Sequence, residues 1–189
     1  MATGTDTPAT VRPVKSASGE TLELGPIADG ETAGLFMLFN HIVATGEGFP
    51  HRPPLTRESF EATWVKPVSV VVVARVAGAS GGGVGDVAGA YYLKPNFVGK
   101  ADHIANAGYI VSPDHRRKGI GRALLEDSIW RAPLVGYDAI QFNLVFASNP
   151  ARAMYEELGW REIGRVPDAV NGEEGIIYWR SVAGEGGVR

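Results

Sequence analysis

Starting at position 111, the chain reads Val111-Ser-Pro-Asp-His-Arg116-Arg117-Lys118-Gly119-Ile120-Gly121-Arg122. A strand is predicted to end at Val111 and a helix to begin near Gly119, so consecutive cations and a glycine occupy the turn between them. The start of a helix offers unpaired N–H groups and a partial positive charge, and glycine lets a ligand approach the backbone closely. These features predict a turn that binds a pyrophosphate, with a solvated basic turn as the alternative interpretation.

A second informative block reads Asn149-Pro-Ala-Arg-Ala-Met-Tyr155-Glu-Glu-Leu-Gly159-Trp160. It predicts a short helix over residues 150–158, with Pro150 in the first turn and Gly159 beyond the end. Asn149 precedes this helix, where its side chain would cap an N–H group and contribute about 1 kcal/mol.

The two blocks together resemble the GCN5-related N-acetyltransferases, the GNAT family. The pattern Val111-x4-Arg116-x2-Gly119-x-Gly121 is similar to the acetyl-CoA-binding signature of that family. The second block is similar to its later Asn…Ala…Tyr…Gly-aromatic motif. The resemblance implies an α/β fold of the mixed α+β kind, in which a mostly antiparallel sheet with flanking helices splays between its fourth and fifth strands. On this sequence those strands are residues 103–111 and 139–145.

The same resemblance implies the cofactor and its site. The chain would be an N-acetyltransferase that uses acetyl-CoA, with the pantetheine arm in the gap of the sheet. Tyr155 matches a tyrosine near the sulfur and is the expected general acid, with aromatic packing as the alternative role. A backbone N–H at the end of the splayed strand would stabilise the developing oxyanion. The expected cofactor-binding residues are Ile110, Val111, Arg116, Arg117, Lys118, Gly119, Ile120, Gly121, Arg122 and Asn149.

Asparagines within predicted strands point to the acceptor. Asparagine is disfavoured in strands, so Asn106 and Asn143 are predicted to face the gap and contact the substrate, with hydrogen-bonded edge positions as the alternative. The chain also resembles, more narrowly, the fungal acetyltransferases that act on proline analogues. In those enzymes asparagines matching Asn106, Asn143 and Asn149 have a role toward the substrate or the cofactor, so this resemblance also implies contact with the substrate. The matching segments are Tyr91–Phe97, His103–Tyr109, Phe142–Val145 and Gly164–Pro167.

The predicted acceptor is therefore the amine of a small molecule, in particular a proline-like amino acid. Other acceptors stay open, namely a protein N-terminus, a lysine or an aminoglycoside, and so does a non-catalytic module that senses acyl-CoA. No general base stands out in the sequence. Glu47, in the loop from Gly46 to Pro54, is one candidate and a water molecule is another.

Periodicity outside the two blocks completes the expected fold. A loose N-terminal arm is predicted over residues 1–18, followed by one domain over 19–189. Helices are expected over residues 29–43, with Asp29 as N-cap, over 56–65 and over 119–131. Strands are expected over residues 21–24, 69–76, 87–93, 103–111, 139–145, 160–165 and 175–181.

Composition excludes several classes of partner. Basic and acidic residues number 18 and 21, so the formal net charge of −3 gives no general attraction to nucleic acid. Cysteine is absent, which rules out thiolate metal sites and an acyl-cysteine. This is consistent with the expected direct transfer of the acetyl group in a ternary complex. The spacing of His41, His51, His103 and His115 fits no metal site.

The sequence also predicts location and assembly. The first ten residues show neither a basic nor an apolar signal region, and no apolar run approaches the ~20 residues that span a bilayer. We expect a cytoplasmic protein with no membrane partner. By analogy with the family, a homodimer is also expected, with residues 172–180 as a strand that could pair across the axis.

Overall fold

A computed structural model of the chain describes residues 7–46, 48–66, 68–77 and 87–184. Its helices are α1 (Glu31–Ala44), α2 (Arg57–Trp64), α3 (Ile120–Arg131) and α4 (Arg152–Glu157), with short 3-10 turns at η1 (Gly99–Ala101), η2 (Pro113–His115) and η3 (Pro133–Val135). The strands are β1 (Arg12–Lys15), β2 (Thr21–Pro26), β3 (Val70–Val76), β4 (Val87–Pro95), β5 (Ile104–Val111), β6 (Ala139–Phe146), β7 (Arg161–Val170) and β8 (Glu173–Ser181).

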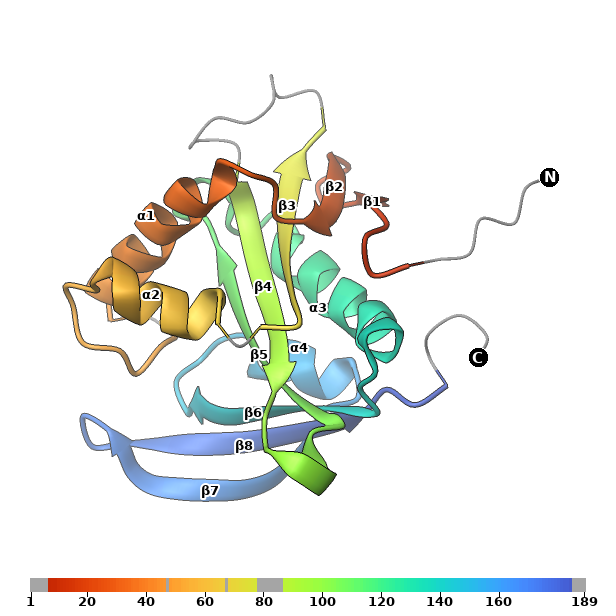
Figure 1. Ribbon diagram of the computed structural model, residues 1–189. Coiled ribbons are helices and arrows are strands. Elements are labelled where there is room, and N and C mark those ends of the chain that lie inside the picture. Colours follow the sequence, from red (N-terminus) through yellow and green to blue (C-terminus); the bar gives the residue numbers. More distant parts are fainter. Residues whose placement is uncertain (1–6, 47, 67, 78–86, 185–189) are drawn as a thin grey trace.

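All eight strands belong to one sheet in the order β1-β2-β3-β4-β5-β6-β8-β7 (Figure 1). Every neighbouring pair is antiparallel except β5 and β6, which run parallel. The predicted mixed, mostly antiparallel sheet with flanking helices is therefore confirmed.

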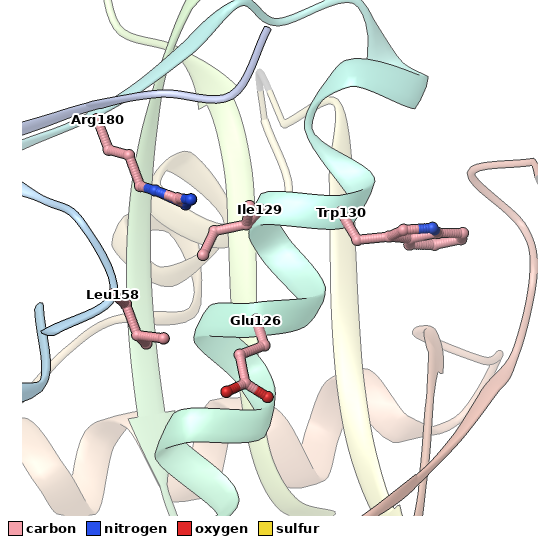
Figure 2. Close-up of a pocket in the computed structure, with 5 residues that line it drawn as sticks. All are labelled: Glu126, Ile129, Trp130, Leu158 and Arg180. Atoms are coloured by element: carbon pink, nitrogen blue, oxygen red, sulfur yellow. The ribbon is translucent and has the colours of Figure 1, made fainter. Parts of the chain in front are cut away.

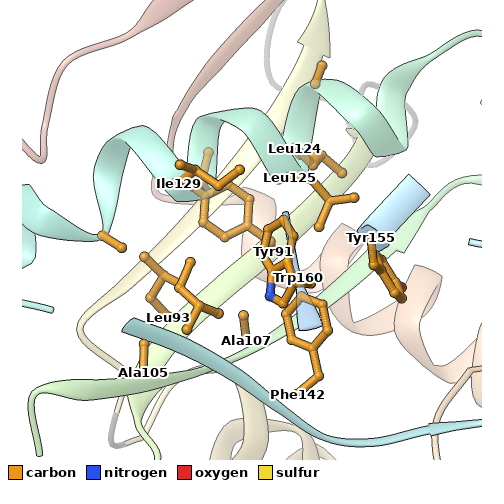
Figure 3. Packing of buried hydrophobic residues seen from close by; sticks show 14 of the residues in the cluster. Tyr91, Leu93, Ala105, Ala107, Leu124, Leu125, Ile129, Phe142, Tyr155 and Trp160 are labelled. Carbon is orange, nitrogen blue, oxygen red and sulfur yellow. The ribbon is translucent and has the colours of Figure 1, made fainter. Parts of the chain in front are cut away.

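Helices cover both faces of the central strands. On one face Phe39 of α1 and Trp64 of α2 pack on Ala90 and Tyr92 of β4. On the other face α3 and α4 pack on the alternate residue of β4, Tyr91, in the cluster shown in Figure 3. Because side chains alternate along a strand, β4 is buried on both sides and carries seven consecutive buried residues.

The sheet splays between β5 and β6, as predicted. Their parallel pairing comprises Ile104 with Ala139, Ala105 with Ile140 and Asn106 with Gln141, and it ends there. Beyond Asn106 the two strands diverge, so β6, β8 and β7 turn away from β1 to β5 (Figure 1). The splayed strands are the expected segments, but they are the fifth and sixth of the chain because β1 precedes them.

Strand β1 corrects the expectation of a loose arm over residues 1–18. Arg12–Lys15 pairs antiparallel with β2, with Arg12 opposite Leu24. The guanidinium of Arg131 donates hydrogen bonds to the carbonyl oxygens of Pro8 (2.6 Å) and Thr10 (3.1 Å). Polar composition suggested disorder, but backbone pairing and a buried arginine hold this segment. Residues 1–6 lie outside the described part.

Several boundaries also differ from the sequence prediction. Helix α1 begins at Glu31 after Gly30, whose φ of 94° gives a left-handed N-cap, so Asp29 is not the cap. Helix α4 is shorter than predicted, whereas β7 extends to Val170. Among the helices that the structure describes, none is long and apolar enough to cross a bilayer.

Candidate active site

A cleft of about 220 Å³ opens where β5 and β6 separate. Its floor comes from the two strands, beginning at Asn106 on β5 and at Phe142 on β6, and one wall comes from residues 48–51 of the loop between α1 and α2. Asn106, Asn143, Asn149 and Tyr155 all line this cleft, as do Phe49, His51, Tyr92 and Tyr109. The structure thus brings together four of the residues selected from the sequence, which come from three separate segments of the chain.

The register of β4 and β5 decides which backbone amides face the gap. The N–H of Ser112 donates to the carbonyl of Ala88 (2.9 Å), and Ile110 lies opposite Ala90. Hydrogen-bonded positions alternate along an antiparallel pair, so the N–H of Ile110 points to β4 and that of Val111 points toward the gap. Of the expected cofactor-binding residues Ile110 and Val111, Val111 therefore has its N–H in the direction that an oxyanion donor needs, and the roles of both residues stay predictions.

Asn106 lies at the point where the sheet opens. Its side-chain amide donates to the carbonyl of Gln141 on β6 (3.2 Å), and its Oδ1 accepts from the hydroxyl of Tyr92 (3.3 Å). Both interactions span neighbouring strands. A side-chain amide has two N–H groups and two acceptor positions. Because Asn106 uses one of each in these bonds, one N–H group and one acceptor position remain for a ligand.

Asn143 lies in a β-bulge of β6. Phe142 pairs with Tyr178 and Val145 with Ile176, so two residues of β6 face a single residue of β8. A bulge bends its strand and changes the direction of a side chain. The Nδ2 of Asn143 donates to Oδ1 of Asn96 (2.6 Å), beside the cleft.

Tyr155 occupies the α4 side of the cleft. Its ring packs edge-on against Phe142, with 5.1 Å between the ring centroids, and lies 5.8 Å from Tyr178. Burial raises the pKa of Tyr155 to about 12, against the smaller opposing effect of a hydrogen bond with Asn149. The hydroxyl is therefore protonated at neutral pH and able to donate.

Asn149 does not cap α4, whose N-cap residue is Ala151. Instead, Oδ1 of Asn149 accepts from the N–H of Ala151 (2.9 Å) in the turn before the helix. The helix therefore begins two residues later than predicted, and Asn149 binds an N–H group of the turn before it. The side chain of Asn149 also forms a hydrogen bond with the hydroxyl of Tyr155. Asn149 consequently positions both the turn and the tyrosine.

The basic turn has the backbone of an anion cradle. Arg117 and Gly119 adopt positive φ angles of 62° and 83°, and Gly119 is the N-cap of α3 without a capping side chain. The first N–H groups of α3 therefore have no side-chain partner at its N-cap, in the arrangement that binds phosphate groups. The backbone and the cations of this turn therefore suit the binding of a pyrophosphate group.

A hairpin turn that the sequence analysis missed supports this cradle. A Cβ added to Gly119 would lie 2.6 Å from the backbone N of Ala17, in the turn between β1 and β2. In the same turn Ser18 Oγ approaches the carbonyl of Lys118 (3.4 Å), and the Glu20 carboxylate lies 3.7 Å from the Lys118 ammonium.

Arg122 differs from the expectation of a phosphate ligand. Its guanidinium pairs with Glu157 of α4 (2.5 Å) and with Glu126 one turn along α3 (3.6 Å). It therefore joins two helices, and the binding of a pyrophosphate by residues 116–122 stays a prediction.

The sequence analysis also missed His51 as a site residue. It considered the four histidines only as metal ligands, and in the described ranges no group of three His, Cys, Asp or Glu could hold a metal ion. Glu47, the carboxylate considered as a base, lies outside the described residues. No sequence signal marks His51, because a loop fold brings it to the cleft.

A second hollow of about 250 Å³ lies between α3 and β8 (Figure 2). Its lining residues are Glu126, Ile129, Trp130, Leu158 and Arg180. Glu126 pairs with Arg122, and the Arg180 guanidinium lies 5.5 Å from the Trp160 ring. None of the residues selected from the sequence lines this hollow, so the cleft between β5 and β6 is the candidate functional site.

The comparisons with known proteins agree with this geometry. Residues 36–160 match the model of the Acetyltransferase (GNAT) family. N-acetyltransferase aca1 of Schizosaccharomyces pombe is 34% identical over 155 residues, which cover 76% of this chain and 74% of that protein. The chain therefore belongs to the GNAT family and is an N-acetyltransferase; its cofactor is acetyl-CoA, the donor of that family.

Solved structures show the same fold. A GCN5-related N-acetyltransferase from Kribbella flavida superimposes with a TM-score of 0.75 at 31% identity, covering 85% of this chain and 97% of that chain. The fold of yncA from Salmonella typhimurium, solved with its cofactor acetyl-CoA, matches with a TM-score of 0.70 at 16% identity, covering 85% and 94%.

Proposed function

We propose that this chain transfers the acetyl group of acetyl-CoA directly to the amine of a small, proline-like amino acid bound in the cleft between β5 and β6. The observation that carries the proposal is the single cleft of about 220 Å³ that gathers Asn106, Asn143 and Tyr155. That volume suits an amino acid beside a thioester better than a folded protein surface. Two strand asparagines offer amide groups to its carboxylate and amine.

Each chain residue has a defined role in the proposed reaction. The turn of residues 116–121 holds the pyrophosphate, and when bound the cofactor supplies an activated acetyl thioester. The N–H of Val111 points into the gap, where it stabilises negative charge that develops on the thioester oxygen. The hydroxyl of Tyr155 donates a hydrogen bond to the departing thiolate, since its raised pKa keeps it protonated.

The experiment is an acceptor panel. Free thiol release from acetyl-CoA is measured with proline, azetidine-2-carboxylate, hydroxyproline, polyamines, an aminoglycoside and peptides with free N-termini or lysines. We expect the highest kcat/KM with a cyclic secondary amino acid. Faster turnover of a peptide would contradict the proposed acceptor, and binding of coenzyme A without turnover of any amine would favour a module that senses the cofactor.

A homodimer and a cytoplasmic location stay predictions. The expected pairing strand, residues 172–180, is wrong for that role, because β8 already pairs with β6 on one side and β7 on the other. The last strand in the sheet order is β7, and its exposed apolar residues Ile163 (54%) and Val166 (37%) support self-association.

A further inference from the structure

We propose that His51 is the catalytic base of this enzyme and accepts the acceptor's proton on Nδ1. The inference deepens the proposed function, because it rests on an amine bound in the cleft between β5 and β6. His51 lies in the loop between α1 and α2, which forms one wall of that cleft. Its ring packs edge-on against Phe39 of α1, with 5.3 Å between the ring centroids.

Hydrogen bonds to the ring define its tautomer. The hydroxyl of Thr63 donates its proton to the carbonyl of Ser59 (3.0 Å), one turn back in α2. Thr63 Oγ1 therefore faces His51 Nε2, 3.3 Å away, as an acceptor. Nε2 must carry the proton, so Nδ1 of the neutral ring has the basic lone pair.

The Nδ1 atom is buried and has no hydrogen-bond partner in the described structure. A buried polar atom without a partner is unfavourable, and a catalytic role is one of the explanations for such an atom in a native structure. The His51 side chain lines the cleft, and a small rotation of its ring would bring Nδ1 within reach of an acceptor amine. An N–H of that amine would then both satisfy Nδ1 and place the proton on the atom that removes it.

The electrostatic surroundings keep His51 neutral. Burial lowers the pKa of His51 below its ordinary 6.5, and the positive charge of Lys94 on β4 lowers it further. The other titratable groups of the cleft are the hydroxyls of Tyr92, Tyr109 and Tyr155, and no described residue of its lining is a carboxylate. At pH 7 the imidazole is thus the one described lining group with a free basic nitrogen.

The proton balance of the step is complete. The acceptor enters the step as the neutral amine, after its ammonium form has lost one proton to solvent. Its nitrogen forms a bond to the acetyl carbon while the bond from that carbon to sulfur breaks. The proton leaves the amine for His51 Nδ1, and Tyr155 supplies a proton to the sulfur. Solvent then removes the proton from His51 and returns one to Tyr155, so no oxidant or further reactant is needed.

The first test is the protonation state of His51 in the intact protein. Two-bond ¹H–¹⁵N spectra of protein labelled in histidine should show His51 with a protonated Nε2, an unprotonated Nδ1 and a pKa below 6.5. A resonance that shows the proton on Nδ1 at pH 7 would overturn the proposal. This measurement needs no acceptor, so its result does not depend on the outcome of the acceptor panel.

The second test compares variants, with azetidine-2-carboxylate as the acceptor. His51→Phe keeps the ring packing on Phe39 and should lower kcat about 100-fold, the scale of general-base catalysis, and remove the fall of kcat at acid pH. His41→Phe alters an exposed histidine of α1 and should retain the kcat and pH profile of the natural protein. A kcat for His51→Phe within threefold of that protein, with the acid fall intact, would refute the proposal.

Thr63 serves as a positioning residue in the same scheme. Thr63→Val removes the acceptor for Nε2–H while keeping the shape of the side chain. We expect a mixed tautomer in the spectra and a kcat about 10-fold lower, with the KM for acetyl-CoA unchanged. A single, unaltered tautomer in this variant would show that Thr63 does not set the proton position.

Discussion

At the residue scale, the cleft is a set of polar groups whose protonation and direction are fixed by their neighbours. Asn106 is held by Gln141 and Tyr92, and Asn143 by Asn96. Tyr155 is enclosed by aromatic rings, so its hydroxyl stays protonated far above neutral pH. In the proposed mechanism these groups are therefore oriented before an acceptor binds.

Replacing Tyr155 by phenylalanine tests this directly. Tyr155→Phe keeps the packing on Phe142 but removes the hydroxyl, so we expect kcat to fall roughly 10²-fold while the KM for acetyl-CoA changes little. Steady-state kinetics at pH 7.5 measures both. The matched control is Tyr137→Phe, which removes a hydroxyl bonded to Ser69 away from the cleft. Equal losses in the two variants would contradict the acid role.

At the element scale, the start of α3 combines a helix N-terminus with a strained turn. Gly119 has a φ of 83° and touches the turn between β1 and β2, so only glycine fits there. From the sequence, we expect the glycines of this turn to let a ligand approach the backbone closely. The structure adds that Gly119 also has a packing role, since the neighbouring hairpin leaves no room for a Cβ.

A pair of glycine variants separates these roles. Gly119→Ala should destabilise the protein by ~2 kcal/mol, because the left-handed backbone and the contact with Ala17 both oppose a methyl group. Gly121→Ala should be neutral or stabilising, since its Cβ would lie 3.8 Å from Val111 and Met154 and the position is helical. Urea denaturation measures both, and similar midpoints would show that Gly119 carries no strain.

Charge variants test the cradle itself. The double change Arg116→Ala, Lys118→Ala should raise the KM for acetyl-CoA at least tenfold and the KM for the acceptor much less, because the turn faces the pyrophosphate. Arg122→Ala should raise the KM for acetyl-CoA less than threefold, since Glu157 and Glu126 hold that side chain. A larger rise in the KM for acetyl-CoA with Arg122→Ala than with the double variant would indicate that Arg122 binds the phosphate groups.

At the scale of the whole molecule, a buried network joins the N-terminal segment to α3 and β4. Asp127 accepts hydrogen bonds from Arg12 (2.8 Å), Tyr91 (2.6 Å) and Arg131 (3.0 Å). The side chains of Asp127 and Arg131 are fully buried. Because Arg131 also holds the carbonyl oxygens of Pro8 and Thr10, this network decides where the chain before β1 lies.

Removing one charge of this network should be costly. Asp127→Asn leaves Arg131 buried without its counter-ion, so we expect a loss of ~3–5 kcal/mol in the free energy of unfolding. Glu61→Gln is the control, because it breaks an exposed pair with Arg57 on α2 and should cost under ~0.5 kcal/mol. Chemical denaturation compares them, and a loss near that of Glu61→Gln would refute the network's role.

The sequence by itself determined the strand-turn-helix at residues 111–122, the later block at 149–160 and the mixed sheet, because local periodicity, turn residues and helix-end signals carry them. Tertiary structure alone decided the rest. The register of β4 and β5 directs the N–H of Val111, and not that of Ile110, toward the gap. A β-bulge lies at Asn143 in the cleft, and Glu157 of α4 pairs with Arg122. His51 came to the cleft through loop packing, which depends on contacts between residues far apart in the chain and leaves no local pattern.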